Sequence, residues 1–148
     1  KIDFRMTIIG QGAQKKIIEN YIKDNNLNKK IKLIKFQKNP FKFIRCSDIF
    51  ILSSEYEGLP NVLLETIVLK KLIISTNCPT GPSEILNNGK GGELVKVGDY
   101  KTMSKKIILY AKKNSNYNKK VNFAYKSIGR FDYYRNLNKY YICIKKYI

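Results

Sequence analysis

The sequence predicts an α/β fold, a doubly wound Rossmann-like domain whose parallel sheet carries helices on both faces. Three observations support this prediction. Short apolar runs alternate with amphipathic segments along residues 4–113. The runs are apolar on both faces, which is typical of parallel strands that are covered on both sides. Glycine or proline stands at most junctions between them, where turns and helix starts are expected.

Three strands and two helices are expected in the first part of the chain. The first strand, residues 4–10, is an apolar run that ends in the glycine turn Gly10-Gln11-Gly12. The next segment, 13–26, has apolar residues at the i, i+1, i+4, i+5 spacing of an amphipathic helix. Then follow a strand at 31–36, a short helix at 41–48 that Pro40 opens, and a strand at 48–54.

The second part alternates in the same way. Pro60 opens a helix at 61–70, a strand follows at 71–76, and Pro82 leads into a short helix at 83–86. Glycines form a turn before a fifth strand at 93–98, and Asp99 is placed to cap a helix at 100–113. Ligands bind beyond the carboxyl ends of parallel strands, so residues 55–61, after the third strand, are the expected binding position.

Residues 114–148 form a basic, aromatic segment, so we place the domain boundary between residues 113 and 114. Five tyrosines lie between Tyr133 and Tyr147, and apolar side chains recur at helical spacing from residue 131 to Ile148. We expect a helix with one apolar stripe and a basic back. It packs on this domain or on a missing one, or its basic and aromatic side chains contact a membrane surface.

The formal net charge is +18, from 29 basic and 11 acidic residues. Lysine supplies 25 of the basic residues and arginine only four, although arginine is better suited to bidentate recognition of phosphates and bases. We therefore interpret the charge first as solvated surface and second as affinity for an anionic membrane surface. No specific nucleic-acid binding is expected.

The chain contains no histidine, which excludes histidine-based triads and argues against a zinc site. Cys46, Cys78 and Cys143 are far apart and are expected to be free thiols in a reducing cytoplasm. No apolar run reaches the roughly 18 residues that span a bilayer, and no secretory leader is visible. Because the chain begins at Lys1, we expect it to be a piece of a longer protein.

The stretch GLPN, residues 58–61, predicts an anion site. Pro60 occupies the expected first position of the helix, where its missing N–H costs nothing. No Ser, Thr, Asp or Asn precedes it directly, so the amides of Asn61, Val62 and Leu63 are left to bind an anion at the positive end of the helix. Gly58 allows a ligand close to the backbone, and a diphosphate fits this position.

Two glutamates flank this position, Glu57 in the loop and Glu65 on the helix. An ionised carboxylate only accepts hydrogen bonds, so vicinal hydroxyls are its natural partners. One glutamate could hold the hydroxyls of a sugar and the other those of a ribose, with the phosphates bound between them by amides. The alternative is an ordinary surface loop followed by a helix salt bridge.

Residues 53–86, SSEYEGLPNVLLETIVLKKLIISTNCPTGPSEIL, closely resemble the signature region of family 4 (group 1) retaining glycosyltransferases. That region has a serine-rich strand end, E-G-(F/L)-P, a second Glu, an apolar strand and G-x-x-E-I/L. IIGQGAQ resembles the family's glycine turn, and IKLIKFQKNP with RCSDIFILSS resembles the stretch around its nucleotide base. The resemblance covers roughly residues 4–110. It implies the C-terminal, donor-nucleotide domain of a GT-B fold, in which two Rossmann-like domains flank a cleft.

The resemblance also assigns roles to individual residues. Glu57 is expected to contact the donor sugar and to be the catalytic residue, and Glu65 is expected to hold the nucleotide ribose. The other donor-binding residues form the loop whose backbone meets the sugar and phosphates: Gly58, Leu59, Asn61 and Val62. The nucleotide base is expected in the vicinity of Phe36, Gln37 and Pro40, and the nucleotide-adjacent turn at Gly10 and Gly12.

Two departures from the family limit what this chain is expected to do. The family's G-R…K-G segment, whose Arg and Lys clamp the diphosphate, has no match here, and the N-terminal GT-B domain is absent from this chain. A departing diphosphate needs fixed positive charge. We therefore expect weak nucleotide-sugar binding and little or no turnover by this chain alone. Gly81 and Glu84 match a downstream turn of the family and are expected to support the structure.

The resemblance implies a bacterial retaining enzyme of the hexosyltransferase type. Such an enzyme moves a sugar from a nucleotide-diphosphate sugar to a glycan or lipid-linked acceptor in polysaccharide biosynthesis. No cofactor and no metal are expected, and the sequence has no Asp-x-Asp motif. A position in the cytoplasm, at the inner face of the membrane, suits a lipid-linked acceptor and the basic tail. Two alternatives stay open: a non-catalytic remnant that binds a partner chain, and a basic module for membrane or nucleic-acid surfaces.

Overall fold

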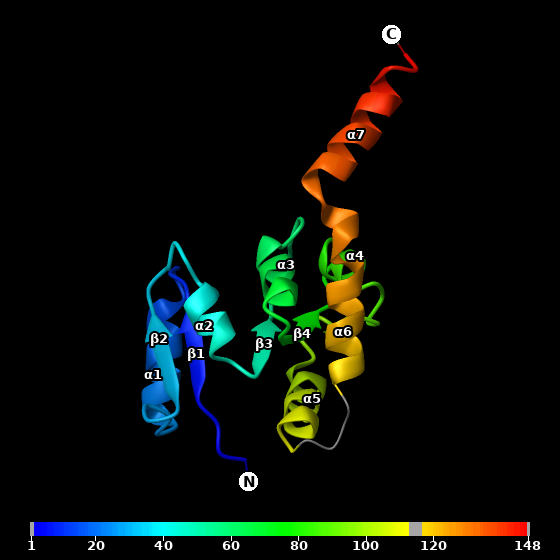
Figure 1. The fold of residues 1–148 in the computed structure, drawn as a ribbon. Helices are drawn as coiled ribbons and strands as arrows, with labels where there is room; N and C mark the ends of the chain where they lie inside the picture. The colour runs from blue at the N-terminus through cyan, green and yellow to red at the C-terminus, as the bar shows by residue number, and fades with distance from the viewer. Residues whose placement is uncertain (1, 113–116, 148) are drawn as a thin grey trace. The chain divides into compact units, whose positions relative to one another are not determined.

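The computed structural model describes residues 2–112 and 117–147. The chain divides into two compact units, Lys1–Cys46 and Ser47–Ile148, which we call unit 1 and unit 2. Figure 1 shows the order of the elements along the chain. The domain boundary that the sequence predicts between residues 113 and 114 lies outside the described residues, as does Ile148.

Unit 1 contains two parallel strands and two helices: β1 (Met6–Ile9), α1 (Lys15–Asp24), β2 (Ile31–Ile34) and α2 (Phe41–Arg45). The strands pair in register from Met6 opposite Ile31 to Ile9 opposite Ile34. The N–H of Gly10 donates to the carbonyl oxygen of Ile34 at 3.0 Å. The carboxyl ends of β1 and β2, with the loops that follow them, therefore lie side by side.

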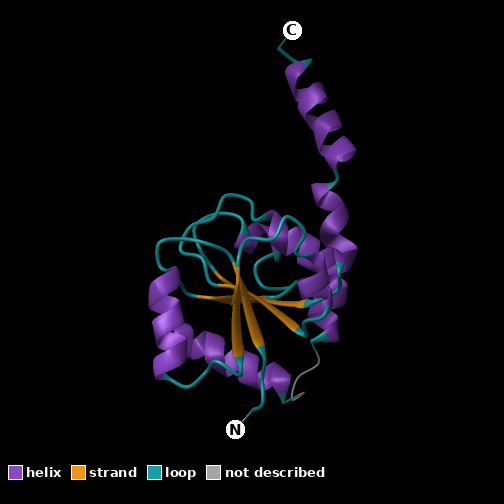
Figure 2. Cartoon of the chain, turned by 90° about the vertical axis from the view of Figure 1, so that its left-hand side faces the viewer, coloured by secondary structure: helices purple, strands orange, loops and turns teal. Residues whose placement is uncertain are grey.

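Unit 2 contains a three-stranded parallel sheet in the order β3-β4-β5. Its strands alternate with helices along the chain; Figure 2 draws the strands of the chain in orange and the helices in purple. In chain order the elements are β3 (Ile49–Leu52), α3 (Asn61–Val68), β4 (Leu72–Thr76), α4 (Pro82–Ile85), β5 (Glu93–Val95) and α5 (Tyr100–Ala111). After the gap come α6 (Asn118–Ser127), the 3-10 turn η1 (Ile128–Phe131) and α7 (Tyr133–Ile144).

The core of unit 2 lies on both faces of β4, whose five residues are all buried. Side chains of a strand alternate between the two faces of its sheet. Ile73 packs in one cluster, with Leu63, Ile67, Ile85, Leu86 and Ala124. Leu72 and Ile74 pack in the other, with Val95, Tyr110 and Val121. α3 and α5 accordingly lie on opposite sides of β4 (Figure 1).

The parallel α/β prediction is confirmed, and all five strands form where the apolar runs lie. Asp99 caps α5 as expected, because its Oδ1 accepts from the N–H of Thr102 at 2.9 Å. The helix α6 was not predicted, yet Val121 and Ala124 bury it against the core. The helix expected from residue 131 begins at Tyr133, with Asp132 as its N-cap.

α7 differs from the other α-helices of unit 2 in that none of its residues is buried. Its aromatic and aliphatic side chains are exposed: Tyr133, Tyr134, Leu137, Tyr140, Tyr141, Ile142 and Ile144. A shallow hollow on this helix is lined by Tyr134, Leu137, Asn138 and Tyr141, which follow one another at the spacing of a single helix face. No helix in the described part of the chain is long and apolar enough to cross a bilayer.

Candidate functional site

The loop between β3 and α3, residues 53–60, holds the first of the predicted glutamates. Glu57 is half-buried, and its Oε1 accepts a hydrogen bond from the Ser54 hydroxyl at 2.6 Å. The Thr80 hydroxyl donates to the main-chain carbonyl oxygen of the same glutamate. Glu57 is therefore held both by its carboxylate and by its backbone.

The end of β4 anchors the same loop. Thr76, the last residue of β4, is buried, and its hydroxyl donates to the carbonyl oxygen of Ser54 at 2.5 Å. A longer contact, 3.4 Å, joins this hydroxyl to the carbonyl oxygen of Leu52 in β3. The loop after β3 thus starts from a point fixed by the neighbouring strand.

Gly81, just before α4, packs against the same loop. A Cβ added to Gly81 would lie 2.2 Å from the carbonyl oxygen of Gly58 and 2.4 Å from Cδ of Pro60. The φ angle of Gly81 is +86°, in the region that side-chain-bearing residues rarely adopt. The close approach supports the structural role expected for Gly81. Glu84, which carries the same expectation, is exposed on α4.

The amino end of α3 corrects one detail of the prediction. Pro60 is the N-cap residue of α3, with an extended backbone (φ −70°, ψ 95°), and the first helical residue is Asn61. The N–H of Leu63 donates to the Pro60 carbonyl oxygen at 2.9 Å. The prediction that this amide is free is therefore wrong. The amides of Asn61 and Val62 have no acceptor among the described residues. Two amides, not three, are open to an anion.

Glu65 lies in the middle of α3 and is half-buried. It stands four residues after Asn61, so both share one face of the helix. Side chains on a helix lean toward its amino end, which directs the Glu65 carboxylate toward the open amides. In the described ranges no side chain forms an ion pair or hydrogen bond with this carboxylate.

The other donor-site candidates lie in the loops where the sequence predicts them. Gly58 and Leu59 are exposed in the loop before α3. In unit 1, Gly10 and Gly12 follow β1, and the nucleotide-base candidates Phe36, Gln37 and Pro40 lie between β2 and α2. The Phe36 side chain is 66% exposed, so its ring face is available to stack on a planar ligand. The turn after β1 and the stretch after β2 lie at one edge of the unit 1 sheet.

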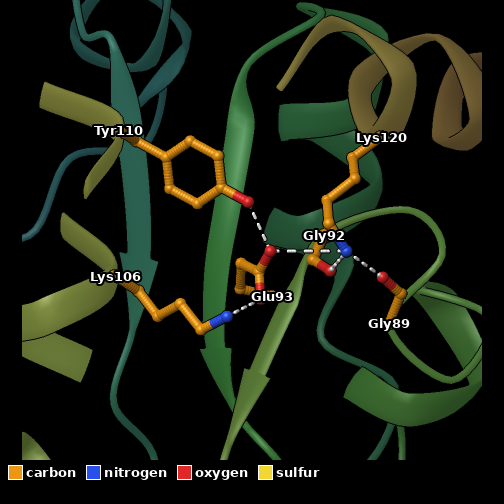
Figure 3. A network of polar contacts seen from close by, with 6 residues as sticks. All are labelled: Gly89, Gly92, Glu93, Lys106, Tyr110 and Lys120. Carbon is orange, nitrogen blue, oxygen red and sulfur yellow. Dashed lines mark hydrogen bonds and ion pairs between the residues drawn. The ribbon is translucent and has the colours of Figure 1, made fainter. Parts of the chain in front are cut away.

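A polar network that the sequence does not predict lies around the buried Glu93, at the amino end of β5 (Figure 3). The Lys106 ammonium of α5 stands 2.9 Å from Oε2, and the Lys120 ammonium of α6 stands 3.3 Å from Oε1. The Tyr110 hydroxyl also donates to Oε1. Lys120 donates further to the carbonyl oxygens of Gly89 at 2.6 Å and Gly92 at 3.1 Å.

The electrostatics of this network favour an ionised Glu93. Burial raises the pKa of the Glu93 carboxyl, but the hydrogen bond from Tyr110 and the charges of Lys106 and Lys120 outweigh it and hold the pKa below its usual value. Because Glu93 stands at the amino end of its strand, it is at the opposite end from Thr76 and the loop of Glu57. We interpret the network as a structural link between α5, α6 and the glycine turn.

Within residues 2–112 and 117–147, no group of three or more Cys, Asp or Glu side chains could hold a metal ion. Cys78 is buried, whereas Cys46 and Cys143 are exposed, and all three are free thiols. The candidate site therefore consists of backbone amides, two carboxylates and hydroxyl groups, a set suited to a phosphorylated sugar.

Comparisons with known proteins show the family and the fold of this chain. A family model described as "Glycosyl transferases group 1" matches residues 1–128. An uncharacterized glycosyltransferase of Methanocaldococcus jannaschii is 44% identical over 82 residues, which are 55% of this chain and 20% of that protein. A second relative, from Campylobacter jejuni, is N-acetylgalactosamine-N,N'-diacetylbacillosaminyl-diphospho-undecaprenol 4-alpha-N-acetylgalactosaminyltransferase. It is 31% identical over 103 residues, 70% of this chain and 28% of its own length.

Among solved structures, that of HepE from Anabaena in complex with UDP superposes with a TM-score of 0.82 at 14% identity. The superposition covers 98% of this chain and 41% of HepE, and it concerns the fold. The chain thus spans less than a third of the length of each of the two curated relatives.

Proposed function

The chain belongs to the group 1 glycosyltransferases, as a C-terminal domain of the GT-B fold, and from this we propose that it binds the donor in a sugar transfer. The proposed donor is a nucleotide-diphosphate sugar. The proposed reaction is a retaining transfer of the hexosyltransferase type to a glycan or lipid-linked acceptor, without a metal or cofactor. One observation carries the proposal: the first two amides of α3 have no acceptor among the described residues, and in chain order they stand between Glu57, which Ser54 holds, and Glu65, which has no partner in the same residues.

The chemistry assigned to this arrangement follows from charge. The amides of Asn61 and Val62, at the positive end of α3, would receive the diphosphate. Carboxylates accept hydrogen bonds but do not donate them, so Glu57 would hold sugar hydroxyls and Glu65 the ribose diol. Gly58 and Leu59 bring the loop backbone to the sugar. Separating acceptor-only side chains from donor amides in this way suits one ligand that carries hydroxyls at both ends and phosphates between.

Retention of configuration would follow from attack on the face that the diphosphate leaves, or from a short-lived ion pair. In either case negative charge grows on the leaving diphosphate and must meet fixed positive groups. The G-R…K-G segment that supplies them in the family has no counterpart in this sequence. We therefore propose that the chain by itself binds donor weakly and turns over little or not at all, and that an N-terminal GT-B domain completes the site.

We propose that the C-terminal segment, residues 114–148, takes part in binding that N-terminal domain. α6 packs on the core of unit 2 through Val121 and Ala124, whereas α7 exposes its tyrosines. We propose that α7 packs on the N-terminal domain. We also propose a cytoplasmic position at the inner face of the membrane. The net charge of +18 and the diphospho-undecaprenol acceptor in the name of the Campylobacter relative support this position.

Isothermal titration calorimetry of the purified chain tests the proposal. The ligands are UDP-N-acetylglucosamine, UDP-N-acetylgalactosamine, UDP-glucose, GDP-mannose and ADP-glucose, each with its parent nucleoside diphosphate. At least one pair is expected to bind. Glu65→Ala should then weaken binding of the sugar nucleotide and of the diphosphate alone by about tenfold, because charged hydrogen bonds to the ribose are lost.

Glu19→Ala is the matched control, because Glu19 is also a helix glutamate but lies on α1 and pairs with Lys15 on the same helix. It should leave both affinities unchanged. Absence of heat with every ligand would overturn the donor-binding function. Equal affinities in wild type and Glu65→Ala would overturn the role of Glu65.

A further inference from the structure

We propose that Ser54 and Thr80 are positioning residues that hold Glu57 in the conformation that reads the donor sugar. The inference rests on the proposed function, and it assigns the discrimination between a sugar nucleotide and the bare nucleotide to a braced carboxylate. Neither hydroxyl is expected to touch the ligand. Both act through Glu57.

The first brace acts on the side chain. A glutamate has three rotatable bonds, and immobilising such a side chain costs conformational entropy. The Ser54 hydroxyl donates to Oε1 of Glu57 at 2.6 Å, a length typical of a strong bond between a hydroxyl and a carboxylate. Oε1 is thereby occupied, and Oε2 has no donor in the part of the chain that the structure describes. The bond therefore presents Oε2 as the free acceptor for a sugar hydroxyl.

The second brace acts on the backbone. The Thr80 hydroxyl, in the turn before α4, donates to the carbonyl oxygen of Glu57. The next residue, Gly81, lies within van der Waals reach of Gly58 and Pro60, where only a missing Cβ permits the approach. The turn at 80–81 therefore restrains the backbone of Glu57 and of the residues that follow it.

Ser54 is itself held in place by a buried residue of the sheet. Thr76 holds the carbonyl oxygen of Ser54 at 2.5 Å, and Thr76 is a buried residue of β4. Ser54 can therefore donate to Glu57 from a fixed position. A group that must meet one hydroxyl gains affinity when its conformation is set before binding, since less entropy is lost on association. This pre-organisation is the function we assign to the two hydroxyl groups.

The test compares affinities for the tightest nucleotide sugar in the calorimetric screen and for its parent diphosphate. We expect wild type to bind the sugar nucleotide more tightly, and Glu57→Ala to abolish that preference. Ser54→Ala and Thr80→Val should each reduce the preference by about 3- to 10-fold while leaving the affinity for the diphosphate unchanged. The conservative variants Ser54→Thr and Thr80→Ser keep a hydroxyl and should restore the preference.

Ser83→Ala is the matched control, because its hydroxyl donates to Asn88 Oδ1 at 2.8 Å within the α4 segment and not to the loop. A purely structural role would lower the melting temperature and both affinities together in the Ser54 and Thr80 variants. That result, or an unchanged preference in Ser54→Ala and Thr80→Val, would overturn the inference. If Glu57→Ala alone loses the preference, the inference fails while the proposed function stands. If no nucleotide binds wild type, the function itself fails.

Discussion

The α-carbon of Gly81 faces the carbonyl group of Gly58 so closely that a Cβ on Gly81 would stand 2.2 Å from the Gly58 oxygen. Two loops that follow neighbouring parallel strands, β3 and β4, are thus in backbone contact at the carboxyl edge of the unit 2 sheet. The contact limits how far the loop of Glu57 can move, because Gly81 lies directly against the main chain of Gly58 and the ring of Pro60.

Gly81→Ala is expected to destabilise the chain by about 1–3 kcal/mol, the range found for overpacking of a tight site. The positive φ angle of Gly81 adds to this cost. Urea unfolding followed by circular dichroism measures the loss. Gly129→Ala is the control, since a Cβ there would meet no atom within 4 Å and should leave the free energy of unfolding nearly unchanged. Equal stability of both variants would contradict the close contact.

Glu93 should make the free energy of unfolding depend on pH. Burial raises its pKa, yet Tyr110, Lys106 and Lys120 lower it below the ordinary value of 4.5. A depressed native pKa contributes stability above the unfolded pKa, and this stability is lost as the pH falls through the native value. Glu93→Gln should therefore be less stable than wild type at pH 7, and the difference should shrink as the pH falls below 4.5.

Thermal unfolding at several pH values between neutrality and acid measures this dependence. Glu55→Gln is the comparison, because Glu55 is exposed in the loop after β3 and lies outside the Glu93 network. A difference between wild type and Glu93→Gln that stays constant with pH would contradict the assigned ionisation.

Lys120→Met should lower the free energy of unfolding by about 1–2 kcal/mol, since it removes the donor to two carbonyl oxygens and one charge partner of Glu93. Its neighbour Lys119 is exposed and makes no such contact in the described chain, so Lys119→Met serves as the paired control. Chemical denaturation of both variants decides the matter. The prediction fails if the two substitutions have the same effect.

The two C-terminal helices should differ in what they contribute to stability. Ending the chain after Asp132 removes α7, none of whose residues is buried, and should change the melting temperature little. Ala124→Leu in α6 should lower it clearly, because Ala124 is buried and packs in the first core cluster. Differential scanning calorimetry compares the two. A large loss on removing α7 would show that the helix packs on unit 2.

Much of the fold could be predicted from local signals. The alternation of apolar runs with helical segments locates all five strands, and the Asp99 cap fixes the start of α5. α6 was not predicted, although Val121, Ala124 and Tyr125 follow a helical spacing, because its burial depends on Val121 and Ala124 meeting side chains of distant segments. Tertiary packing, not local propensity, determines that helix.

The candidate site, like the fold, could be predicted only in part. The spacing of Glu57 and Glu65 around Pro60 could be seen in the sequence, and the structure places them in the loop and on the helix as expected. The bond from Thr80 to Glu57 could not be predicted, because it joins residues on either side of β4, whereas the bond from Ser54 is local. The same limit applies to the shortened set of open amides, which depends on the turn that Pro60 makes with Leu63.

The contacts of Lys120 limit which residues can replace it. Its ammonium group has three hydrogens and meets three oxygen atoms, those of Gly89, Gly92 and Glu93. A guanidinium is planar and wider, so arginine could not serve these three directions from the same place. At this position the shape of the charged group matters as well as its charge. Sequence variation among close relatives should accordingly be free at Lys119 and narrow one residue later.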